Sequence, residues 1–200
     1  EGIGDKHIPW IHNVRNTDMI AAIDDEAVMQ VMRLFNEPEG LNLLAESGVN
    51  ASVLGQLSLP GISCICNLLA AIKAAKYYDL TSDDVLFMPM TDSMDLYASR
   101  VEEMNAAEGP FTAKNALAVK SRYLDGASID YLRELNYSDR KALHNFKYFT
   151  WVEQQGRSSE DLRRLWDESF WQETFSTDHI HEWDRRIAAF NDATGVLKSL

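Results

Sequence analysis

Short apolar runs alternate with helical patterns in the first half of the chain, and this alternation constrains the fold more than any other feature. Apolar runs typical of buried strands occur at 18–23, 41–45 and 85–90, and segments of helical spacing occur at 25–35, 62–78 and 94–103. Strands of this kind, separated by helices, are typical of a parallel sheet covered on both faces. We therefore expect an α/β fold over residues 1–104.

The pattern changes at about residue 105, after which no strand pattern appears. Helices are expected over 112–124 and 128–135, and another from Ser138 with an apolar face that contains Phe146 and Phe149. Asp178 is expected to cap a last helix whose inward face carries Ile180, Trp183, Ile187 and Phe190. Residues 105–200 are therefore predicted to be an all-α extension.

Composition and charge exclude several classes of protein. A net charge of −12 leaves nothing to neutralise phosphates, so a nucleic-acid surface is not expected. No run reaches the length of a membrane span and no signal peptide opens the chain. Cys64 and Cys66 are too close for an ordinary disulfide and too few for a zinc site, so they are predicted to be packing residues in a reducing, cytoplasmic compartment. The chain lacks an initiator Met, which favours a fragment or a processed product.

The segment LPGISCICNLLAAIKAAK, residues 59–76, places the hydroxyl of Ser63 at the start of a long apolar helix. One interpretation is that Ser63 caps the helix, a role with a stabilising effect of about 1 kcal/mol. The other is that a ligand lies at this helix end and binds a neutral hydrogen-bond donor. Ser47, in ESGV (46–49), is a rival for the same position.

Four segments, in this order and spacing, resemble a known family. They are EGIGDKHIPWI (1–11), IDDEAVMQVMRLFNEPEGL (23–41), GISCICNLLAAIKAAK (61–76) and DDVLFMPMTDSMDLY (83–97). Together they resemble the carboxyl-terminal part of the fold-type II pyridoxal-phosphate enzymes, the superfamily of cysteine synthase, cystathionine β-synthase and threonine synthase. The helical extension resembles the longer members often called pyridoxal-phosphate-dependent protein β subunits.

The resemblance implies a fold and a cofactor site. Residues 1–104 would be part of a parallel three-layer sheet domain of the tryptophan synthase β type. Ser63 would face the pyridine nitrogen of pyridoxal 5'-phosphate, with Asp92 and Ser93 close to it. Gly2, Ile3 and Gly4 would lie near the substrate side of the ring, where glycine allows a close backbone approach.

The chain departs from the family pattern in ways that limit what it can do. Cys64-Ile65 replaces the usual Ser-Gly after the key serine, Thr91 and Leu96 depart from the last motif, and 46–60 resembles an insertion. No lysine lies in the context of the family's Schiff-base lysine, and the phosphate-binding loop would lie upstream. The chain alone is therefore expected to have no catalytic residues and no activity.

The expected function is that of a section of a lyase or transferase of amino-acid metabolism, which eliminates or replaces a β substituent. Its partners would be an amino-acid substrate, the upstream half of the same enzyme and a second copy in a homodimer. A threonine-synthase-like or thiolase-like subunit that works with a partner is a second interpretation. A third is a non-catalytic α/β interaction domain with a helical arm.

Overall fold

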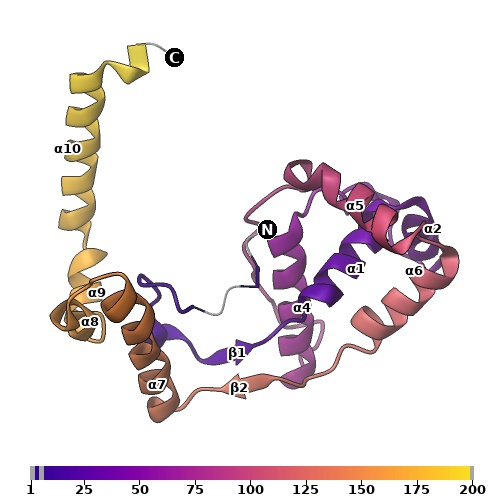
Figure 1. Ribbon diagram of the computed structural model, residues 1–200, viewed down its shortest axis with the longest axis horizontal. Coiled ribbons are helices and arrows are strands. Elements are labelled where there is room, and N and C mark those ends of the chain that lie inside the picture. The colour runs from indigo at the N-terminus through magenta and orange to yellow at the C-terminus, as the bar shows by residue number, and fades with distance from the viewer. Residues whose placement is uncertain (1–2, 5–6, 199–200) are drawn as a thin grey trace. The chain divides into compact units, whose positions relative to one another are not determined.

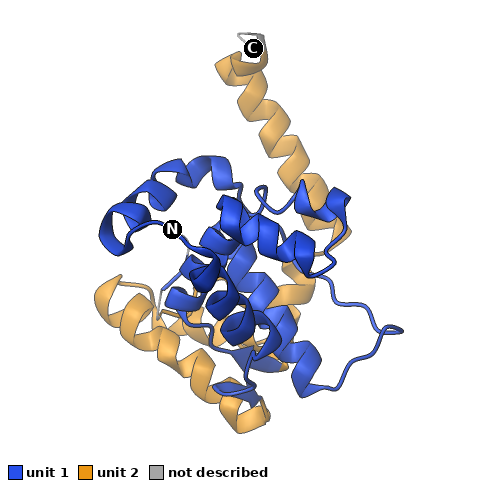
Figure 2. Cartoon of the chain, turned by 90° about the vertical axis from the view of Figure 1, so that its right-hand side faces the viewer, with its two compact units in different colours: residues 1–6, 19–134 blue, residues 7–18, 135–200 orange. Residues whose placement is uncertain are grey.

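The computed structural model describes residues 3–4 and 7–198. The chain forms two compact units (Figures 1 and 2). Unit 1 contains residues 1–6 and 19–134, and unit 2 contains residues 7–18 and 135–200. These units reflect contacts within this chain, whereas the boundary at 104/105 refers to the domains of a larger enzyme and stays a prediction.

Unit 1 is mostly helical (Figure 1). Its α-helices are α1 (Asp25–Asn36), α2 (Pro38–Glu46), α3 (Ala51–Leu54), α4 (Ile62–Tyr77), α5 (Ala98–Glu108) and α6 (Ala113–Val119). A 3-10 helix, η2 (Met94–Tyr97), precedes α5, and a π-helix, η3 (Lys120–Asp125), continues α6. The helix expected over 112–124 is therefore present as the joined pair α6 and η3.

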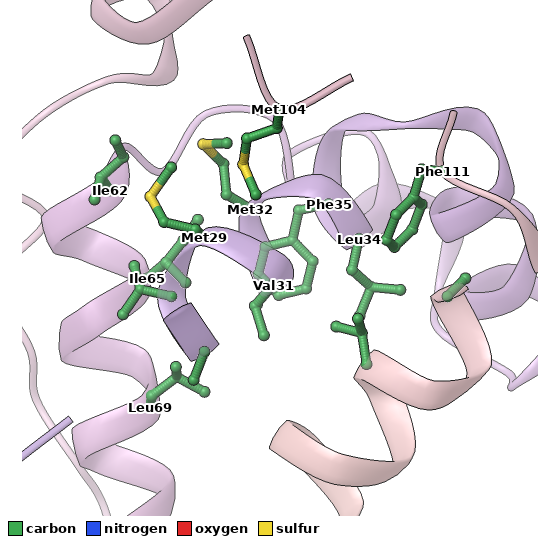
Figure 3. Close-up of a cluster of buried hydrophobic side chains, with 14 of the residues drawn as sticks. Met29, Val31, Met32, Leu34, Phe35, Ile62, Ile65, Leu69, Met104 and Phe111 are labelled. Carbon is green, nitrogen blue, oxygen red and sulfur yellow. The ribbon is translucent and has the colours of Figure 1, made fainter. Parts of the chain in front are cut away.

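The core of unit 1 surrounds α1. Asp24 caps this helix through its side chain, and Asp25 and Glu26 lie in the first turn, where the helix dipole favours acidic groups. Val31, Met32 and Phe35 are buried and pack with side chains of α4 and α6 (Figure 3). The apolar face predicted for 25–35 is confirmed.

The sheet differs from the predicted one. In the described residues it has two antiparallel strands, β1 (Met19–Ala21) and β2 (Leu132–Glu134), with Ile20 opposite Arg133. The short strand expected at 18–23 is present, but the helix expected over 128–135 is wrong. Tyr131 has a φ of 56°, a left-handed conformation that a right-handed helix does not accept, and β2 follows directly.

The strand expected at 41–45 is wrong, because these residues belong to α2. Pro38 occupies the first turn of α2, where its missing N–H costs nothing. Gly40 allows α2 to turn back closely on α1, since a Cβ there would lie 2.1 Å from the carbonyl oxygen of Leu34. A short apolar run such as 41–45 does not by its pattern alone distinguish a strand from a buried helix.

The segment 85–90 has no regular secondary structure. Val85 is 91% exposed and Phe87 is 95% exposed. Among the described residues, 85–88 form no backbone hydrogen bonds. The strand expected at 85–90 is therefore wrong for the described chain, in which no other strand lies beside this apolar run to pair with it.

Unit 2 is helical apart from its loops. Its elements are η1 (Val14–Asn16), α7 (Tyr137–Lys147), the π-helix η4 (Tyr148–Gln154), α8 (Ser159–Arg164), α9 (Glu168–Thr174), α10 (Thr177–Thr194) and η5 (Val196–Lys198). Ser176, rather than Asp178, caps α10. No described helix in either unit is long and apolar enough to cross a membrane.

Two expected apolar faces of unit 2 are largely uncovered. Phe146 and Phe149 are exposed. On α10, the exposed fractions are 43% for Ile180, 42% for Trp183, 58% for Ile187 and 64% for Phe190. The prediction that this face of α10 points inward is wrong for the described chain, because no residue of α10 is buried.

Buried polar groups join the segments of unit 2. The ammonium group of Lys147 donates to the carbonyl oxygens of Trp10 at 2.9 Å and His12 at 2.6 Å, so α7 holds the loop before η1. The ring of His144 is buried, 5.1 Å from that of Trp166. Burial, with the charges of Lys147 and Lys141, lowers the pKa of His144 to about 4.

A buried guanidinium joins the helices of unit 1. Arg33 of α1 is only 2% exposed, and its guanidinium lies over the ring of Phe111 at 4.9 Å. It donates to Glu37 Oε1 (2.7 Å), Asn105 Oδ1 (2.7 Å), Gly109 O (2.9 Å) and Glu108 Oε2 (3.1 Å). One charge therefore connects α1 with the start of α2 and the end of α5.

Replacing Arg33 tests this connection. Arg33→Ala should lower the free energy of unfolding by about 3–5 kcal/mol, because the buried carboxylate of Glu37 loses its counter-charge. Urea denaturation followed by circular dichroism measures the loss. Glu108→Gln is the matched control, with an effect of at most about 1 kcal/mol, because that side chain is partly exposed. A loss under about 1 kcal/mol for Arg33→Ala would contradict the assignment.

The lowered pKa of His144 should make the stability of unit 2 depend on pH. The folded pKa of about 4 lies below the ordinary value of 6.5, so the unfolded chain binds the extra proton first. The stability of the wild type should therefore fall as the pH drops from 6.5 to 4. His144→Phe should flatten this part of the profile in urea denaturation at each pH, while His181→Phe, a change at an exposed position, should not. Equal slopes for wild type and His144→Phe would refute the prediction.

Candidate functional site

Ser63 lies in the first turn of α4 and is half-buried. The N-cap of this helix is Gly61, which has extended backbone and no side chain with which to cap the helix. The interpretation of Ser63 as an N-cap is therefore wrong. Its hydroxyl makes other contacts at the electropositive end of a 16-residue helix.

The hydroxyl of Ser63 lies beside two residues that follow the apolar segment 85–90. Its Oγ is 2.6 Å from Thr91 Oγ1 and donates to Asp92 Oδ1 at 2.9 Å. Backbone bonds hold the two segments together, because Gly61 N–H donates to Asp92 O at 3.2 Å and Met94 N–H to Leu59 O at 3.0 Å. The expected proximity of Asp92 and Ser63 is confirmed.

Asp92 is the centre of this cluster. Besides Ser63, it accepts hydrogen bonds from Tyr97 Oη at 2.7 Å and from Cys64 Sγ at 3.0 Å. Burial alone would raise the pKa of Asp92, but the hydrogen bonds outweigh burial and lower the pKa to about 2. Gly61 makes room for the carboxylate, since a Cβ at that position would lie 2.5 Å from Asp92 Cγ. The site therefore contains an ionised carboxylate at neutral pH.

The two cysteines are free thiols. Cys64 is buried, and its sulfur contacts Asp92 and the backbone N–H of Thr91. Burial, followed by the charge of Asp25, raises the pKa of the half-buried Cys66 and so disfavours a thiolate. The structure gives Cys64 a second role beside packing, as a donor to Asp92.

The other residues predicted to bind the cofactor lie near α1 or outside the residues that the structure describes. Gly2 lies outside the described residues. Ile3 packs against the core of unit 1, and Gly4 has a φ of +83° and lies near α1, since a Cβ at that position would be 3.8 Å from Asp25 Oδ2. No hydrogen bond among the described residues joins Ile3 or Gly4 to Ser63, so their place beside the ring stays a prediction.

The structure also shows where the other serines and lysines considered for the site lie. Ser47 is exposed at the end of α2, where its hydroxyl donates to Leu43 O at 2.8 Å, so it does not begin a helix and the rival assignment is wrong. Ser93 caps η2 by accepting from Asp95 N–H. Lys73 and Lys76 of α4 donate to backbone carbonyl oxygens and not to the Ser63 cluster.

Tyr97 and Thr91 are members of the cluster that the sequence analysis does not identify. Tyr97 follows Asp92 by five residues, and the turn of η2 directs its hydroxyl back to the carboxylate. The signal in the sequence is the spacing of Asp92 and Tyr97 after an apolar run. Only the structure shows that both converge on Ser63.

The Ser63 cluster lies at the surface of unit 1, where Thr91 is exposed and Ser63 and Asp92 are half-buried. A cavity of about 390 Å³ in unit 1 is lined by residues of α1, α4 and η3, among them Lys73, Arg122 and Tyr123, but not by Ser63. In the part of the chain that the structure describes, no group of His, Cys, Asp and Glu is arranged to hold a metal ion. The cluster can bind a polar atom, but this chain alone does not surround a ligand there.

Comparison of the chain with protein-family models, with curated proteins and with solved structures finds no match. The case for a function therefore rests on the residues of this chain and their geometry.

The hydrogen bond from Tyr97 should hold the Asp92 carboxyl in its ionised form. Tyr97→Phe should raise the pKa of Asp92, measured by ¹³C NMR titration of the carboxyl carbon, and Tyr131→Phe, the same change at an exposed tyrosine, should not. Because the folded pKa lies below the ordinary 3.8, the stabilising effect of Asp92 is complete above 3.8 and lost as the pH falls toward 2. An unchanged titration in Tyr97→Phe would contradict this role.

Proposed function

We propose that this chain is the carboxyl-terminal part of a pyridoxal-phosphate-dependent enzyme that eliminates or replaces a β substituent of an amino acid. In this proposal Ser63 binds the pyridine nitrogen of the cofactor. The observation that carries it is the half-buried Ser63 hydroxyl, which lies in the first turn of α4 and caps nothing.

The hydrogen bonds of the cluster fit such a contact. Asp92 accepts from Tyr97, Cys64 and the backbone N–H of Ser63 as well as from the Ser63 hydroxyl. It therefore keeps three donors if that hydroxyl turns to a ligand. A hydroxyl can donate to an aromatic nitrogen, whereas a carboxylate can only accept. Ser63 is thus suited to an unprotonated ring nitrogen, whereas the ionised Asp92 is not.

The surrounding charges influence the protonation of that nitrogen. The positive end of the α4 dipole disfavours a pyridinium, and the ionised Asp92, 2.9 Å from Ser63 Oγ, opposes this effect. Only the first influence can be expected from the sequence. With Asp92 placed beside Ser63, a ring nitrogen bound there would lie between two opposing fields.

When bound, pyridoxal phosphate supplies an electron-accepting ring that weakens bonds at the α and β carbons of an amino acid. The residues of this chain would orient the ring through Ser63 and keep Ser63 in place through Asp92 and Thr91. Proton transfer at the substrate would be the task of the upstream lysine, since Lys73 and Lys76 are held by carbonyl oxygens.

The uncovered segment 85–90 supports the view that the chain is a section of a larger domain. Its exposed apolar side chains and unpaired backbone groups are suited to a strand in a sheet whose other strands come from elsewhere. The proposed parallel three-layer sheet would be completed by the upstream half of the enzyme. The cluster of Ser63, Thr91 and Asp92 would then lie at the end of this strand, where α/β sheets bind ligands.

Two other functions remain as outcomes of the tests. A threonine-synthase-like or thiolase-like subunit would keep the cofactor and change the substrate. A non-catalytic interaction domain would lack the cofactor altogether. The amino-acid substrate class and a homodimeric, cytoplasmic enzyme are parts of the proposal.

The parent polypeptide, including the residues that precede Glu1, tests the proposal. We expect the purified parent to bind pyridoxal phosphate through a lysine, seen as a visible absorbance that borohydride abolishes, and the 200-residue chain to bind none. In the parent loaded with ¹⁵N-labelled cofactor, Ser63→Ala should shift the ring-nitrogen resonance while the cofactor stays bound. Ser47→Ala is the matched control and should leave the resonance unchanged.

Distinct results would reject distinct parts of the proposal. A parent that binds no pyridoxal phosphate would leave the interaction domain as the function. A parent that binds the cofactor, with the same ring-nitrogen resonance in wild type and Ser63→Ala, would remove Ser63 from the site. Elimination or replacement at the γ carbon would reject the proposed reaction.

A further inference from the structure

The helix α10 carries a continuous apolar stripe that no described part of the chain covers. Ile180, Trp183, Ile187 and Phe190 follow one another at intervals of three, four and three residues. This is the spacing of the a and d positions of a coiled-coil heptad, which lie on one seam. All four side chains are more than 40% exposed (42–64%), although α10 is capped at both ends, by Ser176 and by Gly195 in a left-handed conformation.

We propose that this stripe binds the same stripe of a second copy of the chain, with the two α10 helices parallel. This inference rests on the homodimer of the proposed function, to which it assigns an interface, but not on the proposed cofactor. Within unit 2, α10 leads away from α9, so the stripe runs along an extended helix (Figure 1). A helix that is already formed and capped loses little conformational entropy when it associates with a second helix.

The side chains next to the stripe favour a second copy in the parallel orientation. With Ile180 and Ile187 at a positions, Asp184 is an e residue, and His179 and Arg186 are g residues. In a parallel pair, His179 of each copy lies opposite Asp184 of the other and can donate an N–H to it. In an antiparallel pair, Asp184 would face Asp184, which is unfavourable, whereas each of the facing Arg186 side chains is already paired with Glu182 at 2.8 Å.

The area that the stripe offers suits a reversible dimer. Four half-exposed apolar side chains leave about 400 Å² per copy, and flanking atoms raise the total for two copies to about 1,000 Å². This is the lower end of the range for specific interfaces. We therefore expect a dimer that dissociates on dilution in the micromolar range, rather than a permanent one.

Sedimentation of the 200-residue chain over a series of concentrations tests the dimer. The wild type should pass from monomer to dimer, and Ile187→Glu should raise the dissociation constant at least about tenfold, because a charge at the seam is desolvated without a partner. Ala189→Glu introduces the same charge outside the stripe and should leave the dissociation constant unchanged. Circular dichroism checks that both variants keep their helices, which is expected at exposed positions.

Asp184→Asn distinguishes the two orientations. It should weaken a parallel dimer, which loses the contact between His179 and Asp184, and strengthen an antiparallel one, which loses a repulsion. A wild type that stays monomeric up to millimolar concentration would overturn the proposal, as would a dimer that Ile187→Glu does not weaken. A tighter dimer in Asp184→Asn would overturn the parallel arrangement.

Discussion

Unit 1 depends on the placement of one buried positive charge. Arg33 is surrounded by acceptors from the junction of α1 and α2, from α5 and from the turn after α5, and the ring of Phe111 covers its guanidinium. A charge removed from water must be fully hydrogen-bonded, so these segments can pack around α1 in few ways. Because α1 also packs against α4, the helix that carries Ser63, the position of the candidate site is linked to this charge through the core.

Asp92 organises the candidate site in the same way, as a negatively charged group whose hydrogen bonds hold the surrounding segments in place. Its carboxylate draws donors from the start of α4 and from η2, and so fixes the segment that follows residue 90. The two charged groups differ in whether a ligand can reach the side chains around them. Arg33 is enclosed and has a structural role, whereas the donors around Asp92 are numerous enough for the Ser63 hydroxyl to serve a ligand.

The sequence predicts the parts of this structure that follow from local patterns. The apolar face of α1 and the strand near residue 20 are both found. The proximity of Ser63 and Asp92 is found too, but it is expected from the resemblance of the four segments and not from a local pattern. The pairing of strands does not follow from local patterns, because it depends on residues that are distant in the sequence. β1 pairs with residues 132–134, which their spacing predicts to be helical. The positive φ of Tyr131, the turn that Gly40 permits and the return of the Tyr97 hydroxyl to Asp92 have no periodic signal that reveals them.

The uncovered segment 85–90 has a consequence for the life of this chain in a cell. Val85, Leu86, Phe87 and Met88 include neither a proline nor a charge, and in the described chain their backbone groups form no backbone–backbone hydrogen bond. A stretch of this kind is a starting point for intermolecular β-association and aggregation. Wherever this stretch stays exposed, it would favour self-association of the chain and binding by chaperones, and a partner that pairs with it would suppress both.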